Sequence, residues 1–295
     1  MKGIILAGGS GTRLYPLSRV VSKQLLPVYD KPLIYYPLST LMLAGIRDIL
    51  IISTAADTPR LEDLLANGRR FGINISYRVQ PSPDGIAQAF ILGEDFIGDD
   101  ACAMILGDNI FYGNGLTATL KAATQRANME GMGTIFCHCV PDPQRFGVAE
   151  FDSEGRLTAI VEKPSNPKSN YVVTGLYFYP AGVSKLAKKL KPSLRGELEI
   201  TDLNNLYLED RRLYLQLLGR GYAWMDVGTI DALHNSADFI CSVQKNQGII
   251  ISSPEEISYV HGYIDRDTLL QNSRAYANSL YGAHLQAVAE GRIRY

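Results

Sequence analysis

The sequence predicts an α/β fold in which a mostly parallel, Rossmann-like sheet is flanked by helices. In the first half of the chain, short β-branched runs alternate with segments of helical apolar spacing, which is typical of a parallel sheet wrapped by helices. From about residue 131, strand-like runs follow one another with turn residues between them, which indicates a β/α insertion. Residues 241–295 show helical patterns, which predict a helical C-terminal tail.

The first half divides into alternating strands and helices. A run of apolar residues over 3–6 is followed at once by glycines and predicts the first strand. Further strands are predicted over 48–53, 75–79 and 103–106. Helical spacing predicts helices over 34–44, 59–66 and 86–97, the second of them capped by Asp57 or Thr58.

Strands with hairpin turns dominate the insertion. They are predicted from Thr134 onward, over 147–151 and 157–162 with a turn at 152–155, and over 172–179. Helices are predicted over 181–190, 199–209 and 230–243, and in the tail over 254–261 and 275–290. We therefore assign 1–240 to one α/β domain with halves of about 1–130 and 131–240, and 241–295 to an extension for packing and oligomer contacts.

The composition is that of an ordinary globular protein. The chain has 295 residues, 46% of them hydrophobic, and a formal net charge of -1, which gives no overall attraction to nucleic acid or to an acidic membrane. Its apolar stretch over 33–46 contains Pro37 and is too short to span a bilayer. Glycines break the N-terminal apolar run where a signal peptide would continue, so we predict a cytoplasmic protein.

Four cysteines are present, at positions 102, 137, 139 and 241, without a C-x-x-C pair. Cys137, His138 and Cys139 invite comparison with a metal site. In a strand, however, alternation puts both sulfurs on one face and the imidazole on the other. We therefore expect buried, reduced thiols.

A glycine-rich loop, Gly8-Gly9-Ser10-Gly11-Thr12-Arg13, directly follows the first predicted strand. Glycines let backbone N–H groups approach an anion closely, and the Arg13 guanidinium fits phosphate oxygens, so a nucleoside triphosphate is the expected ligand. The loop lacks the Gly-Lys-Ser/Thr ending of a Walker-type phosphate loop. Leu14 also stands where a dinucleotide fingerprint has its third glycine, which disfavours an NAD-dependent oxidoreductase.

The loop is the first of a series of motifs. Gly8 to Leu14, followed by Ser22-Lys23-Gln24-Leu25-Leu26-Pro27, resembles the signature of the sugar-phosphate nucleotidyltransferases. The run over 30–39 resembles the glucose-1-phosphate thymidylyltransferase branch of that family. Further similar motifs lie at 80–85, 106–109, 162–164, 195–202 and 223–226, so the resemblance covers nearly the whole chain.

This resemblance implies an enzyme that converts dTTP and glucose 1-phosphate into dTDP-glucose and pyrophosphate, on a route to dTDP-deoxysugars such as dTDP-rhamnose. In such a reaction a sugar phosphate oxygen attacks the α-phosphorus in line, so catalysis consists mainly of positioning and neutralising charge. Asp108, just past a predicted strand end, suits Mg²⁺ bound to phosphates. The resemblance pairs Asp108 with Asp226 as the second metal ligand, and it implies a homotetramer.

The resemblance also assigns roles to charged residues. Arg13 would hold the leaving pyrophosphate, Lys23 would bridge the phosphates, and Lys163 with Arg195 would neutralise the sugar phosphate. The other residues implied for the nucleotide are Leu6, Gly8, Gly9, Gly11, Thr12, Gln24, Gln80 and Gly85. Those implied for the sugar phosphate are Asn109, Gly147, Glu162, Lys163, Val173 and Arg195.

Selection of the base would fall to the Gln80 amide and the Gly85 backbone. An amide can pair with the imide edge of thymine or uracil, but hydrogen bonds alone do not separate these two bases. The C5 methyl group contributes only about 1–3 kcal/mol, so we expect dTTP to be preferred and UTP to be tolerated.

Two departures from the family pattern stand out. Val227 occupies the position after the second aspartate, where threonine is usual, and Val260 stands where an arginine often helps to bind a regulatory nucleotide. Two alternatives remain open: a uridylyl- or adenylyltransferase on the same scaffold, and a catalytically silent nucleotide-sugar sensor.

Overall fold

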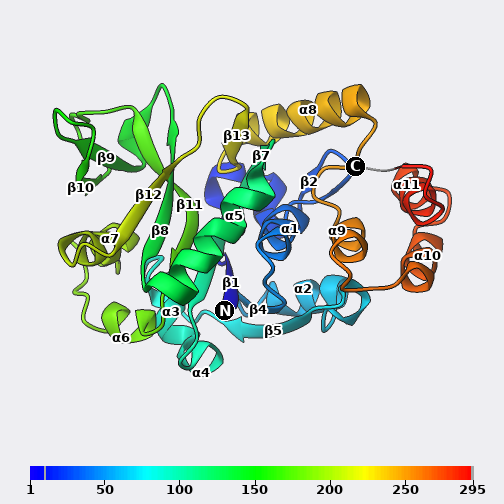
Figure 1. The fold of residues 1–295 in the computed structure, drawn as a ribbon, viewed down its shortest axis with the longest axis horizontal. Helices are drawn as coiled ribbons and strands as arrows, with labels where there is room; N and C mark the ends of the chain where they lie inside the picture. Colours follow the sequence, from blue (N-terminus) through cyan, green and yellow to red (C-terminus); the bar gives the residue numbers. More distant parts are fainter. Residues whose placement is uncertain (10, 294–295) are drawn as a thin grey trace.

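The computed structural model describes residues 1–9 and 11–293. In this part of the chain, nine strands form a central sheet with the order β10-β9-β11-β6-β1-β4-β5, and β8 and β12 continue it beside β11 (Figure 1). These strands are β1 (Lys2–Ala7), β4 (Asp48–Ser53), β5 (Asn74–Val79), β6 (Cys102–Leu106), β8 (Gly133–Cys139), β9 (Gly147–Phe151), β10 (Leu157–Glu162), β11 (Tyr171–Tyr179) and β12 (Leu213–Leu217). Two small ribbons pair β2 (Pro27–Val28) with β3 (Lys31–Pro32), and β7 (Asn109–Gly113) with β13 (Tyr222–Asp226).

Helices surround this sheet. They are α1 (Tyr35–Leu43), α2 (Thr58–Leu65), α3 (Gln88–Leu92), α4 (Glu94–Ile97), α5 (Leu116–Gln125), α6 (Val183–Ala187), α7 (Ile200–Glu209), α8 (Ile230–Gln247), α9 (Pro254–Val260), α10 (Arg266–Ala275) and α11 (Leu280–Ala289). Short 3-10 turns lie at Thr12–Leu14, Leu17–Arg19, Lys23–Leu25, Arg69–Phe71 and Pro143–Arg145, and a π-helical turn at Arg126–Glu130 follows α5.

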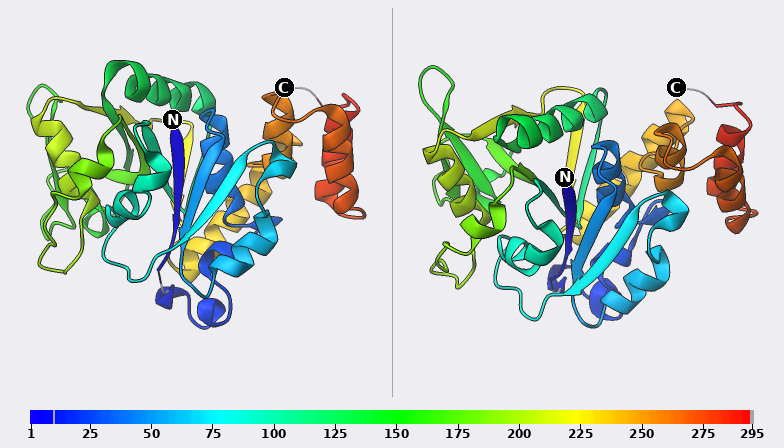
Figure 2. Two further views of the ribbon diagram at one scale, coloured as in Figure 1. Left: turned by 90° about the horizontal axis from the view of Figure 1, so that it is seen from below. Right: turned by 60° about the horizontal axis from the view of Figure 1, so that its bottom comes forward.

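The central strand β1 runs through the middle of the molecule (Figure 2). It pairs in parallel with β4 and β6, and β4 pairs in parallel with β5. Because successive side chains on a strand face opposite sides of the sheet, Ile5 and Ile51 pack with α1, α2 and α5, whereas Ile4 and Leu50 pack with α3, α6 and α7. The predicted parallel sheet with helices on both faces is confirmed.

The parallel strands end at a common edge. After β1 comes Gly8, after β5 comes Gln80, and Asp108 follows two residues after β6. Backbone bonds extend this edge beyond the strands, because Gln80 N donates to Ser53 O (2.7 Å) and Gly107 N donates to Leu6 O (2.8 Å). Loops at this edge are where open α/β sheets bind their ligands.

The insertion is largely antiparallel. β11 joins the central sheet antiparallel to β6 and also pairs antiparallel with β8, and β9 pairs with β10 as a hairpin. The predicted strands over 147–151, 157–162 and 172–179 and the helix over 199–209 are confirmed. The assigned limit near 130 falls before β8, and the limit at 240 falls within α8.

Several predicted helix boundaries are wrong. The helix predicted over 86–97 splits into α3 and α4 at Gly93, where a Cβ would lie 3.0 Å from Ile4 Cδ1. The helix predicted over 181–190 is shortened to α6, because Gly182 before it has a left-handed backbone (φ 91°). The helix predicted over 275–290 begins only at Leu280, since Asn278 is left-handed (φ 68°) and Ser279 caps a new helix. Helices α5 and α10 and strands β7, β12 and β13 were not predicted.

The thiols also differ in part from expectation. All four cysteines are free, and Cys102 and Cys137 are buried as expected, but Cys139 is exposed at the end of β8 and Cys241 is half-buried. Burial raises the pKa of the Cys102 and Cys137 thiols well above the usual value, which keeps them protonated. Among the described helices, none is long and apolar enough to cross a membrane.

A buried carboxylate attaches the tail to the α/β domain. Glu255, on α9, is fully buried and accepts hydrogen bonds from Tyr276 OH (2.7 Å) and Tyr281 OH (2.5 Å). Tyr276 in turn contacts the hydroxyl of Tyr35, on α1. Since a buried carboxylate must be satisfied by donors, these bonds fix α9, α10 and α11 relative to α1.

Replacing Tyr281 with phenylalanine removes one of these donors. We expect Tyr281→Phe to lower the free energy of unfolding by about 1.5–3 kcal/mol, because a buried carboxylate loses a hydrogen bond. Urea unfolding followed by circular dichroism measures this loss. As a control, Tyr171→Phe at a partly exposed position should change it by less than about 0.5 kcal/mol. Equal stabilities of the two variants would contradict this account of the tail.

Candidate active site

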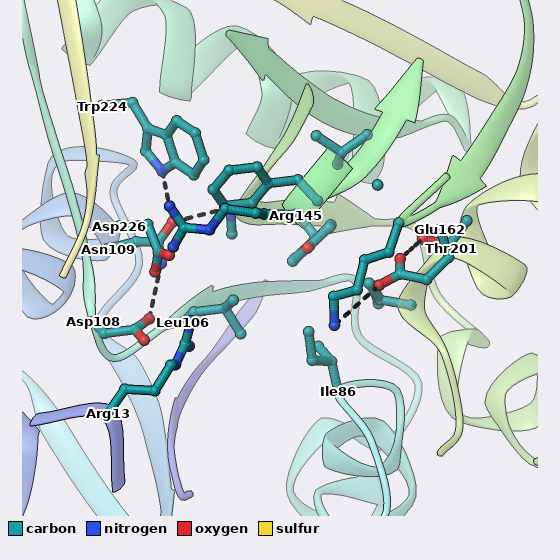
Figure 3. Close-up of a pocket in the computed structure, with 17 residues that line it drawn as sticks. Arg13, Ile86, Leu106, Asp108, Asn109, Arg145, Glu162, Thr201, Trp224 and Asp226 are labelled. Carbon is teal, nitrogen blue, oxygen red and sulfur yellow. Dashed lines mark hydrogen bonds and ion pairs between the residues drawn. The ribbon is translucent and has the colours of Figure 1, made fainter. Parts of the chain in front are cut away.

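Two adjoining cavities open at the carboxyl edge of the parallel strands. The glycine-loop cavity, of about 350 Å³, is lined by Leu6, Gly8, Gly9, Arg13, Gln24, Gln80, Pro83, Gly85, Ile86, Leu106, Asp108 and Glu197. The Glu162 cavity, of about 310 Å³ (Figure 3), is lined by Arg13, Ile86, Leu106, Asp108, Asn109, Arg145, Phe146, Gly147, Glu162, Lys163, Val173, Gly175, Tyr177, Ile200, Thr201, Trp224 and Asp226. Four residues line both cavities, so the two cavities meet at Arg13, Ile86, Leu106 and Asp108.

Asp108 and Asp226 come together through the β7–β13 ribbon. Antiparallel pairing sets Asp226 opposite Asn109, and Val227 N donates to Asp108 O (2.9 Å). The ribbon therefore brings to one place two carboxylates that lie far apart in the sequence. The pairing itself was not predicted, although both aspartates were.

Asn109 fixes the orientation of the first carboxylate. This fully buried amide donates to Asp108 Oδ1 (2.8 Å), and its own Oδ1 accepts from Trp224 Nε1 (2.6 Å) and Gly175 N (3.1 Å) (Figure 3). Because the carboxylate can only accept, the amide nitrogen must face Asp108.

Cations surround the two aspartates. Lys23 forms an ion pair with Asp108. Glycine at 228 leaves space for the Arg13 guanidinium and the Asp226 carboxylate, since a Cβ there would lie 3.2 Å from both Arg13 Nη2 and Asp226 Oδ2. Burial and, after it, the neighbouring Asp108 carboxylate raise the pKa of Asp226 to about 6, although Lys23 and Arg13 oppose the shift. A further cation at this position would therefore be electrostatically favoured.

Glu162 organises the far side of its cavity. It accepts a hydrogen bond from Thr201 Oγ1 (2.5 Å) and lies 3.6 Å from Lys163 Nζ. Lys163 follows β10 with a left-handed backbone (φ 42°), a conformation that is uncommon for a residue other than glycine. Gly147 gives the Thr201 hydroxyl room, because a Cβ there would lie 3.1 Å from Thr201 Oγ1.

Some predicted residues lie just outside the two linings. Arg195 is paired with Glu162 (3.2 Å) and Glu199 (2.8 Å) and does not line either cavity. Lys23 reaches the site through its ion pair with Asp108. Within the described residues, Gly11 and Thr12 line neither cavity, and Ser10 of the same loop lies outside the described residues.

Sequence reasoning assigned no role to several lining residues. Arg145 and Phe146 come from the 3-10 turn before β9, and nothing in the local sequence marks them. Thr201 and Trp224 lie inside two of the motifs that carry the family resemblance, so their motif positions could have indicated them. The aromatic edge of Phe146 packs on Trp224 with ring centroids 5.3 Å apart.

Two carboxylates are the donors present for a metal ion. Within the described residues, no group of three or more histidine, cysteine, aspartate or glutamate side chains could hold a metal. Among the described residues, no such group is formed by Cys137, His138 and Cys139. A pair of hard oxygen ligands suits Mg²⁺, which usually keeps several waters and binds phosphates together with one or two carboxylates.

A smaller cavity of about 210 Å³ lies beside Val260, away from the two described above. Leu43, Glu256 and Ile257 are among the residues that line it. The position at which an arginine was expected thus faces a partly apolar hollow between α1 and α9.

The raised pKa of Asp226 leads to a prediction for the metal-free protein. A carboxyl group with a raised pKa stabilises the fold while it is protonated, and this contribution is lost as the pH rises through about 6. Asp226→Asn cannot ionise, so its free energy of unfolding at pH 8 should exceed that of the wild type by up to about 3 kcal/mol.

At pH 4 the two proteins should be equally stable. Urea unfolding in the presence of a chelator at both pH values measures the difference. The exposed Asp99→Asn variant serves as the control and should match the wild type at each pH. A wild type as stable as Asp226→Asn at pH 8 would rule out a destabilising charge at this position.

Comparisons with known proteins agree with this geometry. The family model described as nucleotidyl transferase matches residues 2–243. A glucose-1-phosphate thymidylyltransferase of Xanthomonas campestris pv. campestris is 56% identical over 289 residues, which cover 98% of this chain and 97% of the relative. One of Mycobacterium tuberculosis is 52% identical over 290 residues, which cover 98% and 99%.

A solved structure is also similar. A Bacillus anthracis protein, assigned as a glucose-1-phosphate thymidylyltransferase and solved with sucrose, superposes with a TM-score of 0.74 at 42% identity. The match covers 81% of this chain and 94% of that protein. The chain therefore belongs to the nucleotidyl transferase family, in the group that contains the glucose-1-phosphate thymidylyltransferases.

Proposed function

We propose that this chain transfers the thymidylyl group of dTTP to glucose 1-phosphate, giving dTDP-glucose and pyrophosphate. The observation that carries this proposal is that two cavities meet at Arg13 and Asp108. One is walled by a glycine loop suited to phosphates, and the other by Glu162, Lys163 and Thr201, which offer acceptors and a cation to a sugar phosphate. The names of the relatives favour this substrate pair.

The reaction needs in-line geometry and neutralised charge. An oxygen of the sugar phosphate attacks the α-phosphorus, and the bond from that phosphorus to the bridging oxygen of pyrophosphate breaks. Arg13, at the meeting of the cavities, would hold the leaving pyrophosphate, and Lys23 would contact phosphate oxygens from its place beside Asp108. Lys163 would bind the attacking phosphate, and Arg195 would add positive charge from behind Glu162.

Mg²⁺ completes the proposal. Asp108 and Asp226 would hold it, with the Asn109 amide fixing the orientation of the first carboxylate. The ion would supply charge neutralisation to the phosphates. Val227, at the position where threonine was expected, is fully buried and packs with Ile110 and Tyr36, so this departure fills apolar space beside the carboxylate.

Recognition of both organic groups follows from the same walls. Gln80 and Gly85 would bind the thymine base in the glycine-loop cavity, which favours dTTP and tolerates UTP. Glu162 would accept hydrogen bonds from glucose hydroxyls, with Asn109, Gly147 and Val173 around the sugar. The product would be a precursor of dTDP-deoxysugars such as dTDP-rhamnose.

The first experiment measures pyrophosphate release. With Mg²⁺, dTTP and glucose 1-phosphate, the wild type should form dTDP-glucose, and Asp108→Asn should lower kcat by about a hundredfold or more, because a carboxylate ligand of the Mg²⁺ that neutralises the phosphates is lost. Asp99→Asn, a matched surface control, should keep full activity.

Parallel reactions with UTP and ATP test the choice of base. Turnover with UTP or ATP alone would overturn the thymidylyl assignment. Tight dTTP binding without any release of pyrophosphate would support a silent sensor instead.

A homotetramer in the cytoplasm is the last part of the proposal. The family resemblance is what supports association of subunits, and α8, α9 and α11 each carry an exposed apolar side chain, namely Ile230, Val260 and Leu280. Sedimentation equilibrium should give four times the chain mass of 32.5 kDa. A monomeric mass at micromolar concentration would contradict it.

A further inference from the structure

The loop that carries Gln80 and Gly85 is held rigidly in the wall of the glycine-loop cavity. Leu198 N donates to Asp84 O (2.7 Å), and Ala87 N donates to Leu198 O (3.1 Å). Gly85 has a φ of +109°, and a Cβ there would lie 2.4 Å from Leu198 O, so only glycine permits this approach. The backbone on both sides of Gly85 is therefore fixed.

Three side chains of this loop and of α3 form a chain of hydrogen bonds. Gln80 Nε2 donates to Gln88 Oε1 (2.7 Å), and Gln88 Nε2 donates to Asp84 Oδ2 (2.8 Å). Both glutamine side chains are buried. At the outer end, Asp84 also accepts from Ser82 Oγ.

The carboxylate sets the direction of the whole chain. An ionised aspartate only accepts hydrogen bonds, whereas an amide has a donor end and an acceptor end. Asp84 therefore requires the nitrogen of Gln88, which leaves the oxygen of Gln88 for Gln80. Gln80 must then donate with its nitrogen, and its oxygen points the other way.

That oxygen lies at the cavity wall. A Cβ at Gly8 would lie 2.1 Å from Gln80 Oε1, so glycine at this position leaves the oxygen unobstructed. Among the described residues, neither Gln80 Oε1 nor Gly85 N–H has a hydrogen-bond partner. The wall thus presents one acceptor and one donor, which complement the N3–H and a carbonyl of thymine or uracil. Cytosine held in the same position as thymine would turn its N3 acceptor toward Gln80 Oε1.

We propose that Asp84 and Gln88 are positioning residues that lock the Gln80 amide with its oxygen toward the nucleotide base, and so exclude cytosine. This inference rests on the proposed function and deepens it. Neither residue needs to touch the base. Reversal of Gln80 would reverse Gln88 too, and would turn the Gln88 oxygen against the Asp84 carboxylate.

The test compares binding of dTTP and dCTP by calorimetric titration with Mg²⁺ and without sugar phosphate. Because the triphosphate is common to both, the ratio of their Kd values isolates the base. In Asp84→Asn the side chain at position 84 offers a donor as well as an acceptor, so the amides of Gln88 and Gln80 can adopt either orientation. We expect the dCTP:dTTP ratio of Kd values to fall about 10-fold to 100-fold, since a hydrogen bond to a charged group no longer enforces one direction. Binding of dTTP itself should weaken only about twofold.

A second substitution should restore the fixed orientation of the Gln80 amide. In Asp84→Asn with Gln88→Glu, the acceptor-only group moves to position 88, where it accepts from both the Asn nitrogen and Gln80 Nε2. The ratio should return to the wild-type value, which loss of loop structure could not explain. Ser82→Ala removes a donor to Asp84 but keeps the carboxylate, and should leave the ratio unchanged.

The outcomes separate this inference from the proposed function. The proposed positioning role of Asp84 and Gln88 is overturned by an unchanged ratio in Asp84→Asn, or by a fall that the second substitution does not reverse. If Asp84→Asn does not fold by circular dichroism, Asp84→Ala also removes the acceptor-only end and should lower the ratio alike. Pyrophosphate release by the wild type is measured separately. If the variants change the ratio as expected but the wild type releases no pyrophosphate, the proposed function alone is overturned.

Discussion

The site depends on the antiparallel ribbon of β7 and β13. This ladder closes a long excursion of the chain and forces Asp226 to lie beside Asp108 and Asn109. Two partly buried carboxylates at close range repel one another, and burial together with this repulsion raises the pKa of Asp226. The backbone bonds of the ribbon hold this unfavourable pair in place, because a ladder is stabilised independently of the charges it carries.

The surrounding charges follow from that constraint. Lys23 and Arg13 approach from the loops after β1, on the nucleotide side, whereas Lys163 and Arg195 gather around Glu162 on the other. Of these four residues, Lys23, Lys163 and Arg195 are already paired with a carboxylate of the protein. Incoming phosphates would exchange partners with these carboxylates, which keeps the cations in place before any ligand arrives.

Local patterns were sufficient where local forces decide the structure. The strands over 48–53 and 103–106 were predicted because buried parallel strands are short apolar runs, and the aspartates were found because motifs surround them. The ribbon was missed because pairing of 109–113 with 222–226 is tertiary, and neither segment alternates clearly. Arg145 was hidden for the same reason, since its neighbours in the cavity come from distant parts of the chain.

The tail attached through Glu255 has a consequence for how the molecule can be shortened. The described residues that line the glycine-loop cavity and the Glu162 cavity all precede Val227, so the helices after α8 contribute nothing to either lining. They cover α1, where Ile257 packs into the same apolar cluster as Leu38 and Phe71. A chain ending after Gln247 would keep every lining side chain but expose that cluster to water. The tail thus shields apolar surface from water without contributing a side chain to either cavity.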